Sequence, residues 1–124
     1  MTETPRLLVT GSRNWTDRET IRDELSRAWK HLGASEDTIL VHGACPSGAD
    51  AIADQVWRGW GLPVEAHPAQ WRKHGRRAGP IRNTEMVRAG ADLVLAFPVG
   101  ASPGTRGCIR TARKAGLNVQ VIEG

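Results

Sequence analysis

Three glycine-rich segments of this chain contain the residue types that bind phosphate groups. They are Gly11-Ser12-Arg13, His42-Gly43 with Gly48-Ala49-Asp50, and Pro98-Val99-Gly100 with Gly104-Thr105. Glycine lets the backbone turn sharply and approach a ligand closely, and the forked guanidinium of Arg13 pairs well with phosphate or carboxylate. A helix that begins near Gly48 or Gly104 would also present unpaired N–H groups to an anion. Each glycine alone equally fits a plain turn, but the three segments together predict an anion-binding site.

Asp50 and His42 each allow a structural and a functional interpretation. At a helix N-terminus Asp50 complements the helix dipole, or it accepts a ribose hydroxyl or acts as a general base. His42 follows a predicted strand and is either a structural hydrogen-bonding residue or a ligand contact. Both alternatives stay open at this point.

Basic residues gather between positions 72 and 88, where Glu85 is the one acidic residue. They are Arg72, Lys73, Arg76, Arg77, Arg82 and Arg88, in a chain of net charge +4. Such a cluster attracts phosphate, nucleotide or nucleic acid, or simply solvates the surface. Arg82 lies near a predicted helix start, where a cation is unfavourable unless an anion binds there. Trp71 precedes the cluster and could stack on a base, or pack structurally.

Strand-like and helix-like segments alternate along the whole chain. The predicted strands are residues 6–10, 38–42, 63–67, 92–97 and 118–122. The predicted helices are 16–33, from 47 or 48 to 61, one that has Pro80 in its first turn and ends at 89, and 105–115, with one helical turn near residue 71. Thr16 and Glu19 have the spacing of a capping box for the first helix. In the second helix Trp60 is expected on the buried face with Trp57.

This alternation predicts an α/β fold: a Rossmann-like, doubly wound parallel sheet of about five strands with helices on both faces. We expect one domain over residues 1–124 and the strand order 3-2-1-4-5, with the proline-containing third strand at an edge. In such a sheet, ligands bind at the carboxyl ends of the strands where the strand order reverses. The three glycine-rich segments follow the first, second and fourth strands, so we expect them to meet there.

Composition and motifs exclude several classes of protein. The chain has 124 residues, 40% hydrophobic and 24% charged, as in a soluble domain. It shows neither a membrane-length apolar segment nor a secretory signal, so we expect a cytoplasmic protein without a membrane partner. Cys45 and Cys108 are expected to be free thiols, and no metal site or cofactor is predicted. A Walker A sequence, a Gly-x-Gly-x-x-Gly fingerprint and a nucleophile elbow are all missing, which argues against classical NTPases, NAD dehydrogenases and serine hydrolases.

The motifs, taken in order, resemble the YspA/cpYpsA-related branch of the SLOG superfamily. They are Gly11-Ser12-Arg13, His42-Gly43, Gly48-Ala49-Asp50, Gly79-Pro80-Ile81-Arg82-Asn83 and Gly104-Thr105. The resemblance covers nearly the whole chain and implies a Rossmann-like fold that takes a nucleotide-derived ligand. It also implies a homodimer, because proteins similar to the lonely-guy enzymes commonly dimerise.

The superfamily includes the lonely-guy phosphoribohydrolases, whose two catalytic motifs can be compared with this chain. Arg82-Asn83-Thr84-Glu85-Met86 resembles their Arg-Lys-x-x-Met motif, with Met one place later. The segment from Pro98 to Thr105 resembles their Pro-Gly-Gly-x-Gly-Thr loop but is longer, and Cys108 occupies the position of their catalytic Glu. A thiol does not replace a carboxylate beside an oxocarbenium-like centre. The candidate catalytic residues are therefore Arg82, Asp50 and Glu85.

Three functions follow from these features. The first is binding of a nucleotide or nucleotide-derived phosphate ligand at the carboxyl edge, as a sensor or sequestering module. The second is N-glycosidic cleavage of such a ligand, and the third is single-stranded nucleic-acid binding like that of the DprA/Smf proteins, which belong to the same superfamily. The residues predicted to bind the ligand are Gly11, Ser12, Arg13, His42, Gly43, Gly48, Ala49, Asp50, Arg82, Asn83, Pro98, Gly100, Gly104 and Thr105.

Overall fold

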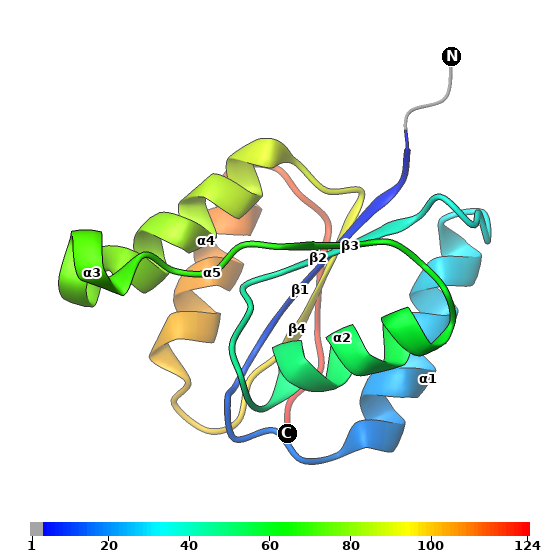
Figure 1. The fold of residues 1–124 in the computed structure, drawn as a ribbon, viewed down its shortest axis with the longest axis horizontal. Coiled ribbons are helices and arrows are strands. Elements are labelled where there is room, and N and C mark those ends of the chain that lie inside the picture. The colour runs from blue at the N-terminus through cyan, green and yellow to red at the C-terminus, as the bar shows by residue number, and fades with distance from the viewer. Residues whose placement is uncertain (1–3) are drawn as a thin grey trace.

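The computed structural model describes residues 4–124, so residues 1–3 of the expected domain lie outside the described part. Its strands are β1 (Arg6–Gly11), β2 (Ile39–His42), β3 (Val64–Ala66), β4 (Leu93–Phe97) and β5 (Val119–Val121). They form one sheet in the order β3-β2-β1-β4-β5, and all neighbours are parallel. The predicted α/β fold, strand order and edge position of the third strand are confirmed (Figure 1).

Helices cover both faces of the sheet because successive strand residues point to opposite sides. Leu7 and Val9 of β1 share a core with residues of α1 (Arg18–His31) and α2 (Ala49–Gly59). Leu8, between them, shares the opposite core with residues of α4 (Ala78–Ala89) and α5 (Pro103–Lys114). Every residue of β4 is buried, as expected for a strand covered on both faces.

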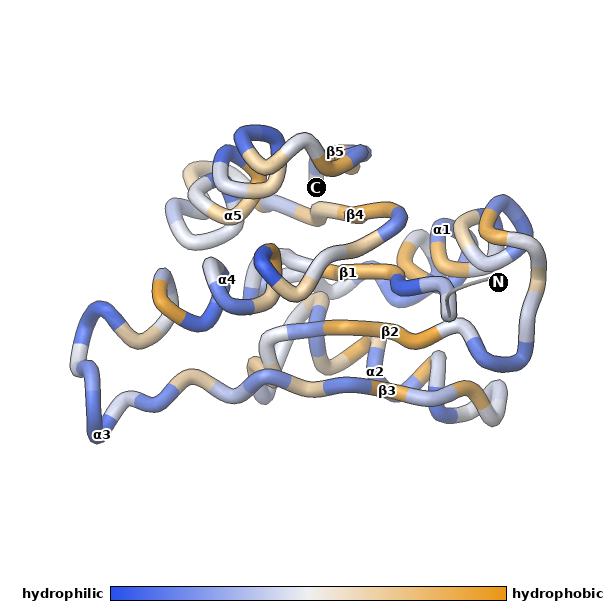
Figure 2. The backbone as a smooth tube through the Cα atoms, turned by 90° about the horizontal axis from the view of Figure 1, so that it is seen from above, coloured by the Kyte–Doolittle hydropathy of each residue, from blue (hydrophilic) through white to orange (hydrophobic). Residues whose placement is uncertain are grey.

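The strand register brings three loops to one edge of the sheet. Gly11 at the end of β1 is paired with Phe97 at the end of β4, and Leu8 of β1 is paired with Val41 of β2. The order reverses between β1 and β4, where a parallel sheet leaves a crevice for ligands. The short helices α3 (Trp71–His74) and η1 (Gly75–Arg77) extend from the body at this edge, beyond β3 (Figures 1 and 2).

Two predictions about where helices begin were wrong. Asp17, not Thr16, caps α1: its Oδ1 accepts the Thr20 N–H at 3.1 Å and its Oδ2 accepts the Thr20 hydroxyl at 2.6 Å. Helix α5 begins at Pro103, two residues earlier than expected, because proline suits the first turn of a helix.

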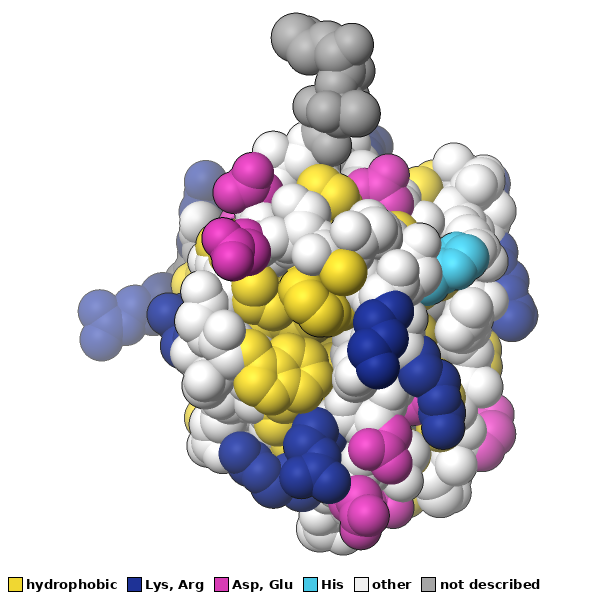
Figure 3. All heavy atoms as spheres, turned by 90° about the vertical axis from the view of Figure 1, so that its right-hand side faces the viewer, with side chains coloured by type: hydrophobic (Ala, Val, Ile, Leu, Met, Phe, Trp, Pro, Cys, Tyr) yellow, Lys and Arg dark blue, Asp and Glu magenta, His cyan; other side chains and the backbone are white. Residues whose placement is uncertain are grey.

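Trp60 lies beyond the end of α2 and is 41% exposed, whereas Trp57 is fully buried. The predicted burial of Trp60 is therefore wrong. Figure 3, which faces the side formed by α1 and the end of α2, shows hydrophobic side chains at the surface there. Within residues 4–124, no helix combines the length and the apolar character needed to cross a membrane.

Candidate functional site

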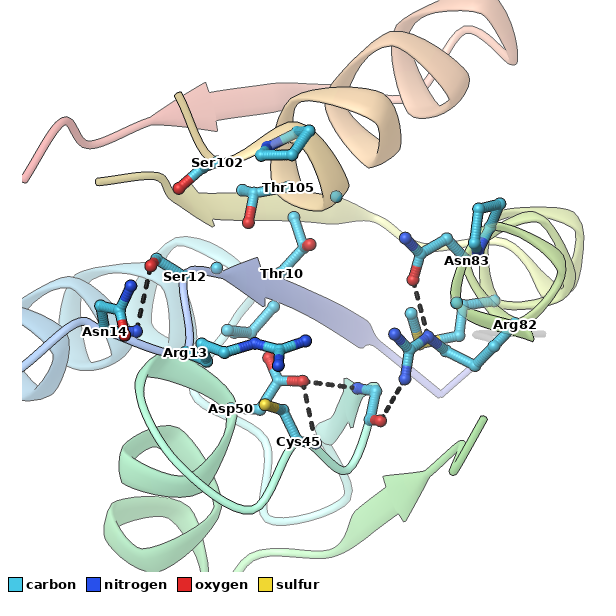
Figure 4. Close-up of a pocket in the computed structure, with 18 of the residues that line it drawn as sticks. Thr10, Ser12, Arg13, Asn14, Cys45, Asp50, Arg82, Asn83, Ser102 and Thr105 are labelled. Atoms are coloured by element: carbon cyan, nitrogen blue, oxygen red, sulfur yellow. Dashed lines mark hydrogen bonds between the residues drawn. The ribbon is translucent and has the colours of Figure 1, made fainter. Parts of the chain in front are cut away.

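A cavity of about 440 Å³ opens at the carboxyl edge of the sheet, among the loops after β1, β2 and β4 (Figure 4). This volume is in the range of small-molecule sites. It is lined by Val9, Thr10, Gly11, Ser12, Arg13, Asn14, Gly43, Cys45, Asp50, Trp71, Gly79, Pro80, Arg82, Asn83, Met86, Val99, Ser102, Pro103, Gly104 and Thr105.

Many of the predicted site residues line this cavity. They are Gly11, Ser12, Arg13, Gly43, Asp50, Arg82, Asn83, Gly104 and Thr105. Six others do not line it: His42, Gly48, Ala49, Glu85, Pro98 and Gly100. Glu85 is exposed on α4. The binding and catalytic roles assigned to all these residues stay predictions.

The loop after β1 is held in place by the start of α2. The Ala49 N–H donates to the Ser12 carbonyl at 3.0 Å, so this helix-start amide is already used within the protein. Gly48 has φ +75°, and a Cβ there would collide with the Ser12 carbonyl and the Arg13 backbone. Gly48 and Ala49 therefore shape the wall of the cavity from behind. The sequence predicts Gly48 as a site residue because glycine allows a close approach of the backbone. In the structure, the group that approaches Gly48 closely is the backbone of Ser12 and Arg13.

Asp50 is a buried carboxylate at the edge of the cavity, with an exposed fraction of 6%. Its Oδ2 accepts the N–H groups of Gly43 at 3.2 Å and of Cys45 at 3.4 Å. Within residues 4–124 its Oδ1 has no hydrogen-bond partner. Burial raises the pKa of Asp50, although the nearby His42, the charge of Arg82 and the two N–H donors oppose this.

Arg82 crosses from α4 to the end of β2. Its Nη1 donates to the Gly43 carbonyl and, at 3.4 Å, to the His67 carbonyl, while its Nε donates to Asn83 Oδ1 at 2.7 Å. These acceptors are neutral, and in the described part of the chain Arg82 forms no salt bridge. Its positive charge is thus positioned at the cavity without being neutralised by a carboxylate.

Arg13 brings a second cation to the cavity from the loop after β1. Its side chain is exposed, and none of the salt bridges formed by residues 4–124 includes it. In Figure 4 the side chains of Arg13 and Arg82 extend into the cavity from opposite sides, and Asp50 lies below the end of Arg13. Two guanidinium groups without carboxylate partners favour an anionic ligand.

The N-terminus of α5 adds backbone donors to this cationic site. The Ser102 hydroxyl is used within the loop, where it donates to the Val99 carbonyl at 2.7 Å and accepts the Val99 N–H at 2.9 Å. The first helical bond runs from the Arg106 N–H to the Ser102 carbonyl, so the N–H groups of Gly104 and Thr105 have no partner within residues 4–124. Free amides at a helix start suit a phosphate or carboxylate.

Gly100 and His42 have structural contacts outside the cavity lining. The Gly100 carbonyl accepts Arg106 Nη2 at 2.7 Å, which anchors the loop after β4. His42 is buried, its Nδ1 accepts the Ala44 N–H at 2.9 Å, and its Nε2 lies 2.7 Å from Asp54 Oδ2. Because Nδ1 is an acceptor, Nε2 carries the proton. These contacts favour the structural interpretation of His42.

Cys108 lies inside the core beneath the sheet edge, with an exposed fraction of 1%. It is absent from the cavity lining, and burial raises the pKa of its thiol. The position compared with the catalytic Glu of the lonely-guy enzymes therefore holds a neutral, buried group in this chain.

Several lining residues were missed by sequence reasoning. They are Val9, Thr10, Asn14, Cys45, Met86, Val99, Ser102 and Pro103. Their position beside the glycine motifs is the one feature of the sequence that could have identified them.

Trp71, considered for base stacking, lines the cavity and is 55% exposed, and a Cβ on Gly79 would lie 3.6 Å from its ring. Among residues 4–124, no three His, Cys, Asp or Glu side chains gather as a metal site would require.

The fold and site together define a Rossmann-like domain with a cationic cleft at the switch point of its sheet. The chain belongs to the YspA, cpYpsA-related SLOG family, whose family model matches residues 5–74. It is 49% identical over 123 residues to the gene 61 protein of Mycobacterium phage D29. That match covers 92% of this chain and 93% of the phage protein. Membership of this family indicates a nucleotide-related binding or processing role.

Solved structures match this chain at lower sequence identity. Two crystal structures of the C-terminal domain of a hydrogenase from Pyrococcus furiosus are 19% and 18% identical to this chain, with TM-scores of 0.49 and 0.47. Each match covers 98% of this chain, and 92% and 94% of the respective structures.

Proposed function

We propose that this protein binds a nucleotide or nucleotide-derived ligand through its phosphate, as a sensor or sequestering module. The observation that carries this proposal is the pair Arg13 and Arg82, which line one cavity without a carboxylate partner among residues 4–124. Arg82 is half-buried, and a half-buried cation without a salt bridge is costly, so a bound phosphate would offset that cost. Arg13 is exposed and adds a second positive charge at the same cavity.

Two further features fit a nucleotide better than a simple phosphate ion. The free N–H groups of Gly104 and Thr105 add neutral donors for phosphate oxygens. The exposed ring of Trp71 offers a flat apolar surface on the same cavity, and a nucleobase stacks well on such a ring. A ligand with a charged end and an aromatic end would use both.

Native mass spectrometry of the freshly purified protein tests this proposal, followed by calorimetric titration with ribonucleoside mono-, di- and triphosphates. We expect a nucleotide-like adduct or measurable binding that weakens about 10-fold or more in Arg82→Ala. Arg22→Ala is the matched control, because Arg22 is an exposed arginine of α1 with no salt bridge among residues 4–124. The proposal is contradicted if mass spectrometry finds no adduct and calorimetry detects no binding of any nucleotide in the panel.

A second candidate is cleavage of the N-glycosidic bond of the same ligand. It is favoured by the unpartnered Oδ1 of Asp50, since a carboxyl group whose pKa is raised by burial is suited to proton transfer. Incubation with nucleotides should then release free base and ribose phosphate, detected by chromatography. Turnover should fail in Asp50→Asn, and Glu85→Gln tests the other predicted carboxylate.

A third candidate, single-stranded nucleic-acid binding, is favoured by the exposed basic residues next to Trp71. They are Arg72, Lys73, Arg76 and Arg77 of α3 and η1. Binding of an oligonucleotide would weaken steeply with rising salt, whereas a small nucleotide should respond less. The expected homodimer stays a prediction, which light scattering of the purified protein tests.

A further inference from the structure

Asp50 lies on the cavity wall and has an acceptor oxygen that no group within residues 4–124 uses. Its exposed fraction is 6%, its Oδ2 is engaged by Gly43 and Cys45, and its Oδ1 has no partner within residues 4–124. A buried polar atom without a hydrogen bond costs free energy, so such atoms in native proteins call for an explanation. The position of Asp50 on the cavity wall supplies one, because a ligand can bring the missing donor.

We infer that Asp50 Oδ1 accepts a hydrogen bond from a sugar hydroxyl, so that the ligand is a ribonucleotide with a free 2′- or 3′-hydroxyl. This inference rests on the proposed function and specifies the chemical class of its ligand. An ionised carboxylate is an acceptor only, and it repels phosphate. The donors that a nucleotide offers are its ribose hydroxyls and, on some bases, an exocyclic amine.

The arrangement of the cavity favours the hydroxyl over the amine. In Figure 4 the Asp50 carboxyl lies below the end of the Arg13 side chain, and Arg82 lies on the other side of the cavity. Trp71 lies on the Arg82 side, since a Cβ on Gly79 would come within 3.6 Å of Trp71 and 3.9 Å of Arg82 Nη2. The carboxylate of Asp50 disfavours the phosphate, which Arg13 and Arg82 attract, and the exposed ring of Trp71 is the surface for the base. The sugar is then the part of the nucleotide left to contact Asp50. Asp50 also begins α2, and two backbone N–H groups hold its carboxyl in a fixed orientation.

The experiment compares ribonucleotides with their 2′,3′-dideoxy counterparts by calorimetric titration. Adenosine and uridine 5′-monophosphates form the two pairs, and uracil has no exocyclic amine. We expect each ribonucleotide that binds to lose about 10-fold or more in affinity when both hydroxyls are removed, as for a hydrogen bond to a charged acceptor. The 2′-deoxy and 3′-deoxy forms then identify the hydroxyl concerned.

Asp50→Asn separates this role from a structural one. The variant keeps an oxygen for the Gly43 and Cys45 N–H groups but lacks the negative charge, so the ribose preference should fall to a few-fold or less. Asp23→Asn is the matched control, since Asp23 is an exposed carboxylate of α1, and it should retain the full preference. Circular dichroism verifies that both variants are folded.

Each outcome leads to a separate conclusion. Equal affinity for ribo- and dideoxynucleotides in the wild-type protein overturns the inference while leaving nucleotide binding intact. An undiminished ribose preference in Asp50→Asn overturns the assignment to Asp50. Absence of binding by every nucleotide tested overturns the proposed function itself.

Discussion

The substitution Gly43→Ala separates the position of Arg82 from its charge. A Cβ on Gly43 would lie 2.6 Å from Arg82 Nη1 and 2.7 Å from its Cζ. The guanidinium must therefore retreat by roughly 0.8 Å, the difference between 2.6 Å and the 3.4 Å at which ordinary contact begins. Gly43 has no positive φ, so alanine fits its backbone conformation. The strain falls on the flexible end of Arg82, and the fold should be retained.

The expected magnitudes follow from the contacts of Arg82. Displacement weakens its bond to the Gly43 carbonyl, which should lower the free energy of unfolding by about 1 kcal/mol. Loss of a charge-assisted contact with the ligand costs about 1.5–3 kcal/mol, or roughly 10- to 150-fold in Kd, which is the range for Arg82→Ala. Gly43→Ala should fall near the lower end, about 10-fold, because the charge is displaced rather than removed.

The assay is calorimetric titration with the nucleotide that binds the wild-type protein most tightly. Gly59→Ala is the matched control, since no atom of residues 4–124 outside the local helix backbone lies within 4 Å of a Cβ on this helix-end glycine. In an Arg82→Ala background, Gly43→Ala should have almost no further effect on binding, because the group that it displaces is gone. The reasoning is refuted if Gly43→Ala binds as the control does, or if it weakens binding equally with and without Arg82.

Three further predictions concern other parts of the molecule. Asp17→Ala should lower the free energy of unfolding by about 1 kcal/mol in urea titration, because it removes the cap of α1; an unchanged midpoint would mean that the cap contributes nothing. Burial raises the pKa of Asp50, so the folded state binds this proton more readily than the unfolded state and loses stability as the pH rises above the ordinary value of 3.8. Asp50→Asn should therefore stabilise the unliganded protein increasingly as the pH rises above 3.8 in thermal melts, until the folded-state carboxyl is fully ionised. A constant or opposite difference would contradict this sign. Trp71→Ala should weaken nucleotide binding by about 1–3 kcal/mol yet leave ribose 5-phosphate affinity unchanged, and equal losses for both ligands would exclude base stacking.

Local sequence patterns predicted the elements well where one interaction dominates. The apolar residues 93–97 predicted a buried strand, and β4 is buried at every position because helices cover both faces. The boundary of α1 was harder, since Thr16 and Asp17 are both good caps and adjacent in the chain. The side chain that reaches the free amides of the first turn is selected by how the loop after β1 approaches the helix.

Pattern reasoning was weaker for residues whose role depends on distant partners. Gly48 was selected as a ligand-binding glycine, a role that stays a prediction, and the pattern gave no sign that its small size also admits the Ser12–Arg13 backbone. Trp60 matched the helical spacing of the buried face, yet α2 ends before it. Spacing along the chain carries no information about where a neighbouring loop or the end of a helix intervenes.

The sequence by itself determined the alternation of strands and helices, the parallel sheet and the edge at which the glycine-rich loops meet, because periodicity and turn residues act over a few neighbouring positions. Only the tertiary structure decided that Arg82 rests on the Gly43 carbonyl and that Asp50 keeps one oxygen without a partner within residues 4–124. Arg82 and Gly43 are 39 residues apart, and their contact exists only after α4 packs beside the end of β2. The charge and the acceptor that the cavity offers to a ligand depend on that packing.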